Sequence, residues 1–140
     1  MNEPLTEDLL DELLNSPSPT DYVEDRQLQK RNLSQYLQQL LDEHGLVRKD
    51  VVRAAGIDAT YGYQLFTGQR SNPSRDKTLA LAFALGCSLR ETDRLLQAAG
   101  ASRLYVKERR DAIIVFCLDQ GLSVDEVNET LYHMGEETLG

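Results

Sequence analysis

Residues 46–70 read LVRKDVVRAAGIDATYGYQLFTGQR, and this stretch decides the fold. A short apolar-periodic segment that contains two alanines ends at Gly56, and Ile57 and Asp58 follow at once. Aspartate is a favoured helix N-cap, so a second short helix is predicted to begin at Asp58. Small residues and glycine at such a corner let two helices cross steeply with their backbones close together. The stretch therefore predicts a helix-turn-helix.

Helical periodicity continues along the rest of the chain. An apolar stripe at i, i+3, i+4, i+7 and i+8 is formed by Leu33, Tyr36, Leu37, Leu40 and Leu41. Where such stretches end, the position that favours a left-handed residue is filled by Gly45, Gly56, Gly86, Gly100, Gly121 and Gly135. The pattern predicts an all-α protein, with helices at about 33–44, 47–55, 58–67, 74–85, 88–99, 108–120 and 123–134.

The second half of the chain contains an internal repeat. A shift of 35 residues places 75–104 over 110–139 without a gap and gives eight identities in thirty positions. Both copies contain a serine followed three residues later by a glutamate, which is the spacing of a capping box: Ser88 with Glu91, and Ser123 with Glu126. The repeated unit is therefore predicted to be a helical hairpin, and residues 105–140 a second, C-terminal copy of it.

Charge is unevenly distributed along the 140 residues, which carry 15 basic and 23 acidic side chains for a net charge of −8. Residues 1–30 have a net charge of −6, residues 31–77 of +2 and residues 78–140 of −4. The whole-chain charge argues against a polyanionic partner, because phosphate binding depends on lysine and arginine. The one positive stretch nevertheless coincides with the predicted helix-turn-helix, as a local DNA-binding surface requires.

The first thirty residues differ from the rest and are predicted to form an acidic segment and linker ahead of a helix-turn-helix domain at 31–104. Amphipathic spacing is shown by Leu5, Leu9, Leu10, Leu13 and Leu14, and a Pro- and Ser-rich linker follows at 15–20. Two alternatives remain open. The segment is either a short helix that docks on its own domain, or an acidic amphipathic segment that binds a protein partner or masks the basic face.

Candidates for catalysis and metal binding are scarce. His44 and His133 are isolated, so no convincing base stands beside a nucleophile. Cys87 and Cys117 lie in apolar stretches and are predicted to be buried thiols of a cytoplasmic protein. No glycine cluster has phosphate-loop spacing, no apolar run reaches about 18 residues, and the N-terminus lacks the pattern of a secretory signal. We therefore expect no enzymatic activity, cofactor, metal or membrane attachment.

The same residues resemble the pattern of a known family. The motif V-V-x-x-A-G-I-D, then L-F-x-G-x-R, P-S and T-L-x-x-A-x-A-L-G, resembles the λ-repressor/Cro-like (XRE-type) helix-turn-helix DNA-binding domains. The likeness covers about residues 33–99. It implies a five-helix λ-repressor-like domain, here extended by the duplicated C-terminal hairpin, with 47–55 as the first helix of the motif and 58–67 as the recognition helix.

The resemblance also implies which residues contact double-stranded DNA. At the start of the first helix, phosphate contacts are expected from Arg48 and Lys49. The recognition helix would present Ala59, Thr60, Tyr63, Gln64 and Thr67. Among these, Gln64 is the best candidate for base reading, because its amide can pair with an adenine edge through two hydrogen bonds. The following loop would supply backbone clamps at Arg70, Ser71, Asn72 and Arg75.

Two positions depart from the family pattern. Gly62 stands where these domains normally have a buried aliphatic residue, at a cost of about 1 kcal/mol in helix propensity. Asp58 places a negative charge near the expected phosphate-facing surface. Two functions are therefore kept. The first is a sequence-specific DNA-binding transcriptional regulator that acts as a homodimer, and the alternative is a protein-interaction adaptor that has the fold but no longer binds DNA.

Overall fold

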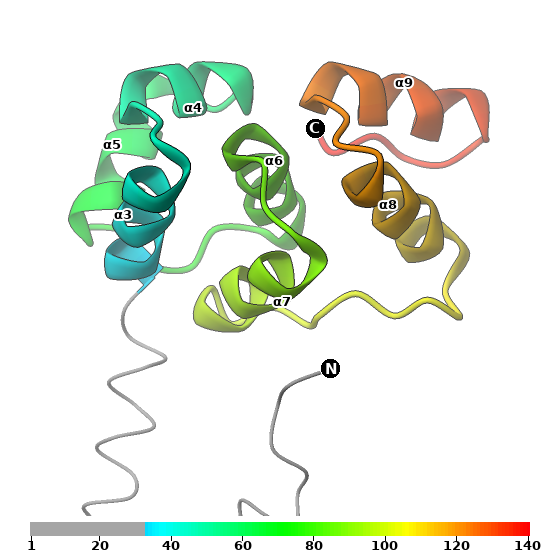
Figure 1. Ribbon diagram of the computed structural model, residues 1–140, viewed down its shortest axis with the longest axis horizontal. Coiled ribbons are helices and arrows are strands. Elements are labelled where there is room, and N and C mark those ends of the chain that lie inside the picture. Colours follow the sequence, from blue (N-terminus) through cyan, green and yellow to red (C-terminus); the bar gives the residue numbers. More distant parts are fainter. Residues whose placement is uncertain (1–32) are drawn as a thin grey trace, which may run out of the picture.

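The computed structural model describes residues 33–140, and this part of the chain is built from α-helices without a β-strand (Figure 1). The helices are α3 (Leu33–His44), α4 (Arg48–Ala54), α5 (Ala59–Thr67), α6 (Arg75–Leu85), α7 (Leu89–Ala98), α8 (Arg109–Asp119) and α9 (Val124–His133). The prediction of an all-α protein is confirmed, and each predicted helix ends within one residue of the observed one. The acidic segment at 1–30 lies outside the described residues.

Local capping explains where the repeated helices begin. The amide of Glu91 lies 3.1 Å from Ser88 Oγ, and the Ser88 amide lies 2.9 Å from Glu91 Oε1. The same two distances recur between Ser123 and Glu126 at the start of α9. Both predicted capping boxes are therefore confirmed, and each satisfies two backbone amides that the helix itself leaves without acceptors.

The turn inside each hairpin depends on a glycine in the left-handed conformation. Gly86 has a φ of 70° and its counterpart Gly121 a φ of 69°. The residue after each glycine donates its amide back into the preceding helix, from Cys87 to the carbonyl of Ala82 and from Leu122 to that of Cys117. This return bond closes both hairpins in the same way.

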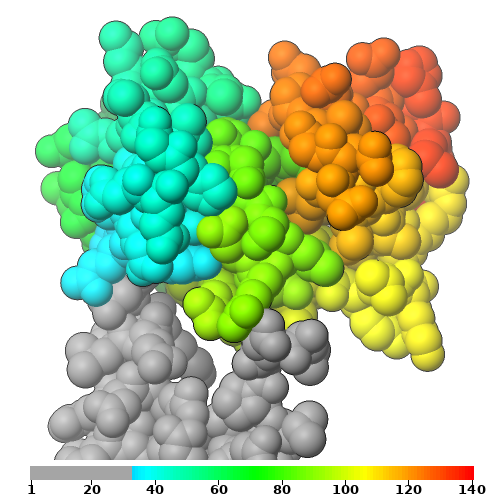
Figure 2. All heavy atoms as spheres, viewed as in Figure 1, coloured from blue at the N-terminus to red at the C-terminus, as the bar shows by residue number. Residues whose placement is uncertain are grey.

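Helix α6 lies at the centre of the described structure (Figure 1). Helices α3, α4 and α5 lie to one side of it, and α8 and α9 lie to the other. A single apolar core runs from Leu33 to Leu139, so residues 105–140 share the core of helices α3 to α7. Figure 2 shows the atoms of α8 adjoining those of α6 and α7 on the face that is drawn.

The two hairpins are packed reciprocally. Helix α6 contacts α9, and α7 contacts α8, so each helix of one hairpin meets the opposite helix of the other. Reciprocal contacts of this kind characterise a two-fold, isologous interface, whereas a repeat related by translation would not return to its first copy. The 35-residue repeat is therefore arranged as a pseudo-two-fold pair.

Candidate nucleic-acid interface

Helices α4 and α5, where the sequence predicts a helix-turn-helix, contact each other, and α5 also packs on α3. Asp58 caps α5 by accepting a hydrogen bond of 3.1 Å from the Tyr61 amide. Leu65 and Phe66 hold α5 to the core, and Val51 and Val52 do the same for α4. These apolar contacts determine which face of α5 remains open to solvent.

The departure from the family pattern at Gly62 has a packing reason. Gly62 is buried where α5 passes α4, and a Cβ at this position would lie 2.5 Å and 2.7 Å from the two γ-methyl carbons of Val52. Carbon atoms in contact are normally about 3.5–4.0 Å apart. The glycine therefore permits a close approach of the two helices that an aliphatic residue would prevent.

The open face of α5 carries the residues expected to meet DNA. Ala59, Thr60, Tyr63 and Thr67 are exposed, and Gln64 is half-buried. The Thr67 hydroxyl donates to the Gln64 carbonyl over 3.3 Å, which leaves the Gln64 side-chain amide out of this contact. In the loop after α5, Arg70, Ser71 and Asn72 are also exposed.

Basic side chains lie against aromatic rings on α5. The guanidinium carbon of Arg48 is 4.7 Å from the centre of the Tyr63 ring, and Lys77 Nζ is 4.4 Å from the centre of the Tyr61 ring. Cation–π contacts of this kind hold a charge in a defined place on a surface. Sequence reasoning missed Lys77, because nothing in the spacing shows that Tyr61 on α5 and Lys77 on α6 meet.

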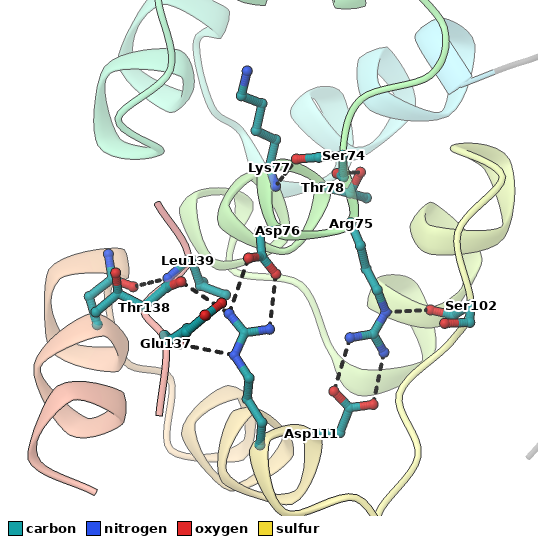
Figure 3. Close-up of polar contacts among 12 residues, drawn as sticks. Ser74, Arg75, Asp76, Lys77, Thr78, Ser102, Asp111, Glu137, Thr138 and Leu139 are labelled. Atoms are coloured by element: carbon teal, nitrogen blue, oxygen red, sulfur yellow. Dashed lines mark hydrogen bonds and ion pairs between the residues drawn. The ribbon is translucent and has the colours of Figure 1, made fainter. Parts of the chain in front are cut away.

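Arg75 has a different role from the one expected. Its guanidinium donates two hydrogen bonds, of 2.9 Å and 2.8 Å, to the Asp111 carboxylate and one to the Ser102 carbonyl (Figure 3). A fourth bond goes to the Arg103 carbonyl. All three guanidinium nitrogens therefore donate within the protein. The structure assigns Arg75 to the hairpin interface, which corrects the expectation that it clamps a DNA phosphate.

The thiols in the described part of the chain are buried, as predicted. Cys87 is 4% exposed and Cys117 is fully buried. Burial raises the pKa of the Cys87 thiol to about 12 and also raises the pKa of Cys117. Since the thiolate is the nucleophilic and metal-binding form, both residues act as small core side chains. Between residues 33 and 140, no cluster of three or more His, Cys, Asp or Glu could hold a metal ion.

Comparison with protein-family models, curated proteins and solved structures finds no match to this chain. Among the described helices, none combines the length and the apolar composition needed to cross a membrane.

Acid is expected to destabilise the fold through Asp111. Burial alone raises the pKa of this carboxyl, but hydrogen bonds from Arg75 and from the Tyr105 amide outweigh burial and lower it below its usual value. A lowered folded-state pKa means that the ionised carboxylate stabilises the fold at neutral pH. This contribution should be lost as the pH falls from about 5 through the folded-state pKa.

Urea denaturation between about pH 7 and pH 3 tests this expectation. The free energy of unfolding should fall toward acid in the wild type, and it should fall less in Asp111→Asn, which cannot titrate at this position. The same pH profile for both proteins would contradict a contribution from Asp111.

Proposed function

We propose that the chain binds double-stranded DNA through the α4–α5 face, defined by Arg48, Lys49, Thr60, Tyr63, Gln64, Thr67 and Arg70. The observation that carries the proposal is the contact between Arg48 and Tyr63. It brings the basic start of α4 onto the outward face of α5, so that positive charge and groove-facing polar side chains occupy one surface. A helix with such a face has the dimensions to enter the major groove.

Within this face, the side chains divide into two kinds of contact. Arg48, Lys49 and Arg70 are exposed cations that would neutralise phosphates and set the position of the protein on the duplex. Thr60 and Gln64 would meet base edges, and the Gln64 amide is suited to adenine. The Asp58 carboxylate caps α5 by accepting a hydrogen bond from the Tyr61 amide. The partial positive charge at this helix end therefore offsets part of the negative charge of Asp58.

The proposed role is that of a transcriptional regulator without enzymatic activity. One helix-turn-helix makes few base contacts, and such domains commonly bind two half-sites as dimers. We therefore propose a homodimer on DNA. The net charge of −8 for the whole chain predicts weak binding that depends strongly on salt.

An interaction adaptor is the second candidate, and a specific observation favours it. Leu46 and Val47, just before Arg48, are 39% and 61% exposed. Exposed apolar residues beside the basic start of α4 suit a protein partner at the same face. On this alternative the chain would keep the helix-turn-helix fold and bind a protein in place of DNA.

Salt dependence separates the two candidates. Anisotropy of a labelled random duplex should show binding at about 50 mM salt that weakens steeply toward about 200 mM. Arg48→Ala and Arg70→Ala should each lower the slope of log K against log salt by about 1, because each removes a phosphate contact. Lys107→Ala is the matched control, since this exposed lysine lies on the connection between α7 and α8, away from α4 and α5.

The outcomes are distinct. Reduced slopes for the two arginine variants with an unchanged slope for Lys107→Ala support DNA binding through the α4–α5 face. No detectable binding of the full chain at low salt rejects the regulator and leaves the adaptor. An equal decrease of the slope in all three variants would show that the protein is attracted to DNA by its charge, without a defined binding face.

A further inference from the structure

The interface between the two hairpins contains two ion pairs that mirror each other. Arg75 of the first hairpin pairs with Asp111 of the second, at 2.9 Å and 2.8 Å. Arg110 of the second pairs with Asp76 of the first, at 3.0 Å and 3.2 Å (Figure 3). The Arg-Asp dipeptide at the start of α6 and its repeat at the start of α8 therefore exchange partners.

Each hairpin ends in a short extended segment, here called its strap: residues 102–104 in the first hairpin and 137–139 in the second. Each arginine also binds the strap of its own hairpin. Arg75 donates to the carbonyls of Ser102 and Arg103, and Arg110 donates to those of Glu137 and Thr138, which are the positions 35 residues later. The straps are held in a second matching way, since the Leu104 amide donates to Asp93 and the Leu139 amide donates to Asn128. Each hairpin is thus closed by its own strap, and it presents one arginine and one aspartate to the other hairpin.

The apolar contacts follow the same symmetry. A small depression between the hairpins is lined by Phe83, Gly86 and Cys87 and by their repeat counterparts Leu118, Gly121 and Leu122. Each of the three residues that one hairpin contributes to this depression is therefore accompanied by the residue at the equivalent position of the other hairpin. A surface whose residues are complementary to copies of themselves is the kind used in two-fold homodimers.

The connection between the hairpins contributes little to this interface. Residues 105–108, just ahead of α8, are exposed, with Tyr105 at 59% and Val106 at 63%. Its hydrogen bonds to the rest are local, chiefly the Tyr105 amide to Asp111 and the Glu108 amide to the Tyr105 carbonyl. The connection therefore leaves open which chain supplies the second hairpin.

We propose that two copies of this chain exchange their C-terminal hairpins, so that α8 and α9 of one copy pack on α6 and α7 of the other. The exchanged dimer repeats every ion pair and apolar contact of the hairpin interface, now between chains. It is two-fold symmetric and presents two α4–α5 faces. The proposal depends only on the hairpin interface and stands apart from DNA binding.

The connection between the hairpins controls the balance between the closed monomer and the exchanged dimer. A short linker gives the tethered hairpin an effective concentration in the millimolar range, so the closed monomer dominates at micromolar protein. Exchange becomes easier to observe when closure within one chain is disfavoured and closure between two different chains is not. Charge reversal of one ion pair creates this situation.

The test uses two full-length variants, Asp76→Arg and Arg110→Asp. Each alone places like charges opposite each other, both within the chain and in its own homodimer. When the two are mixed and refolded together, one exchanged interface has the native Asp76 and Arg110, and the other has the reversed pair. This pair is chosen because the Asp76 and Arg110 side chains are 36% and 16% exposed, so a reversed pair keeps contact with water.

Native mass spectrometry of the mixture should show a 1:1 heterodimer at least about tenfold more abundant than any dimer of either variant alone, equivalent to about 1.4 kcal/mol. If the single variants do not fold alone, helical circular dichroism regained on mixing reports the same event. The double variant Asp76→Arg/Arg110→Asp restores the pair within one chain and should be a monomer. A mixture that remains monomeric, or equal dimer in the separate samples, overturns the proposal.

Discussion

Replacement of Arg75 by alanine is expected to lower the free energy of unfolding by about 3 kcal/mol, the range found when one partner of a buried ion pair is removed. Asp111 is 4% exposed and would remain in place with one protein donor, the Tyr105 amide. The carbonyls of Ser102 and Arg103 would also lose their arginine donor. The cost comes mainly from the buried carboxylate that is left without its counter-charge.

The internal repeat supplies a matched control in Arg110→Ala. The substitution is chemically identical and stands at the equivalent position of α8, but it leaves behind Asp76, whose side chain is 36% exposed. Water can hydrate that carboxylate, so we expect a loss of about 1 kcal/mol, as for pairs near the surface. Urea denaturation of the two variants measures the difference. Equal losses would show that burial of the remaining aspartate does not control the cost.

Gly62→Ala is expected to destabilise the protein by about 1–2 kcal/mol, although alanine is the better helix former by about 1 kcal/mol. The new methyl group would lie 2.5 Å from a γ-carbon of Val52. Valine has a stiff χ1 angle, so Val52 cannot easily turn away, and α4 and α5 would have to move apart. Overpacking therefore outweighs the gain in helix propensity.

A double-mutant cycle with Val52→Ala isolates this contact. Val52→Ala alone should destabilise by about 1–3 kcal/mol through loss of buried methyl groups. In the double variant the two γ-methyl groups are gone and only the Cβ of residue 52, at 3.2 Å, stays close, so the gain in helix propensity should meet a much smaller clash. The two changes should therefore couple by at least about 1 kcal/mol. Strict additivity in the urea-derived free energies would contradict the steric explanation.

Residues close in sequence accounted for most of what could be predicted. Ser88 with Glu91, and Ser123 with Glu126, begin helices because each serine and glutamate satisfies amides three residues away. Gly86 and Gly121 end the preceding helices because both adopt positive φ. Helix bounds and hairpin turns are determined by such local rules, and the 35-residue repeat is visible in the sequence itself.

Contacts across the fold could not be obtained in this way. The repeat aligned Arg75-Asp76 with Arg110-Asp111, but it did not show that each arginine pairs with the aspartate of the other hairpin. Arg75 was therefore expected to contact a DNA phosphate. The contact of Lys77 with Tyr61 and the close approach of Gly62 to Val52 likewise join residues on different helices.

The helices, their caps and the duplicated hairpin follow from the amino-acid sequence alone, because hydrogen bonds within one or two turns depend on neighbouring residues. The tertiary structure decided which polar side chains are consumed inside the protein and which are left for a partner. The division between these two groups of side chains depends on how the helices pack around α6, because a buried charge is costly unless it is paired with an opposite charge. Packing of this kind depends on residues from the whole chain.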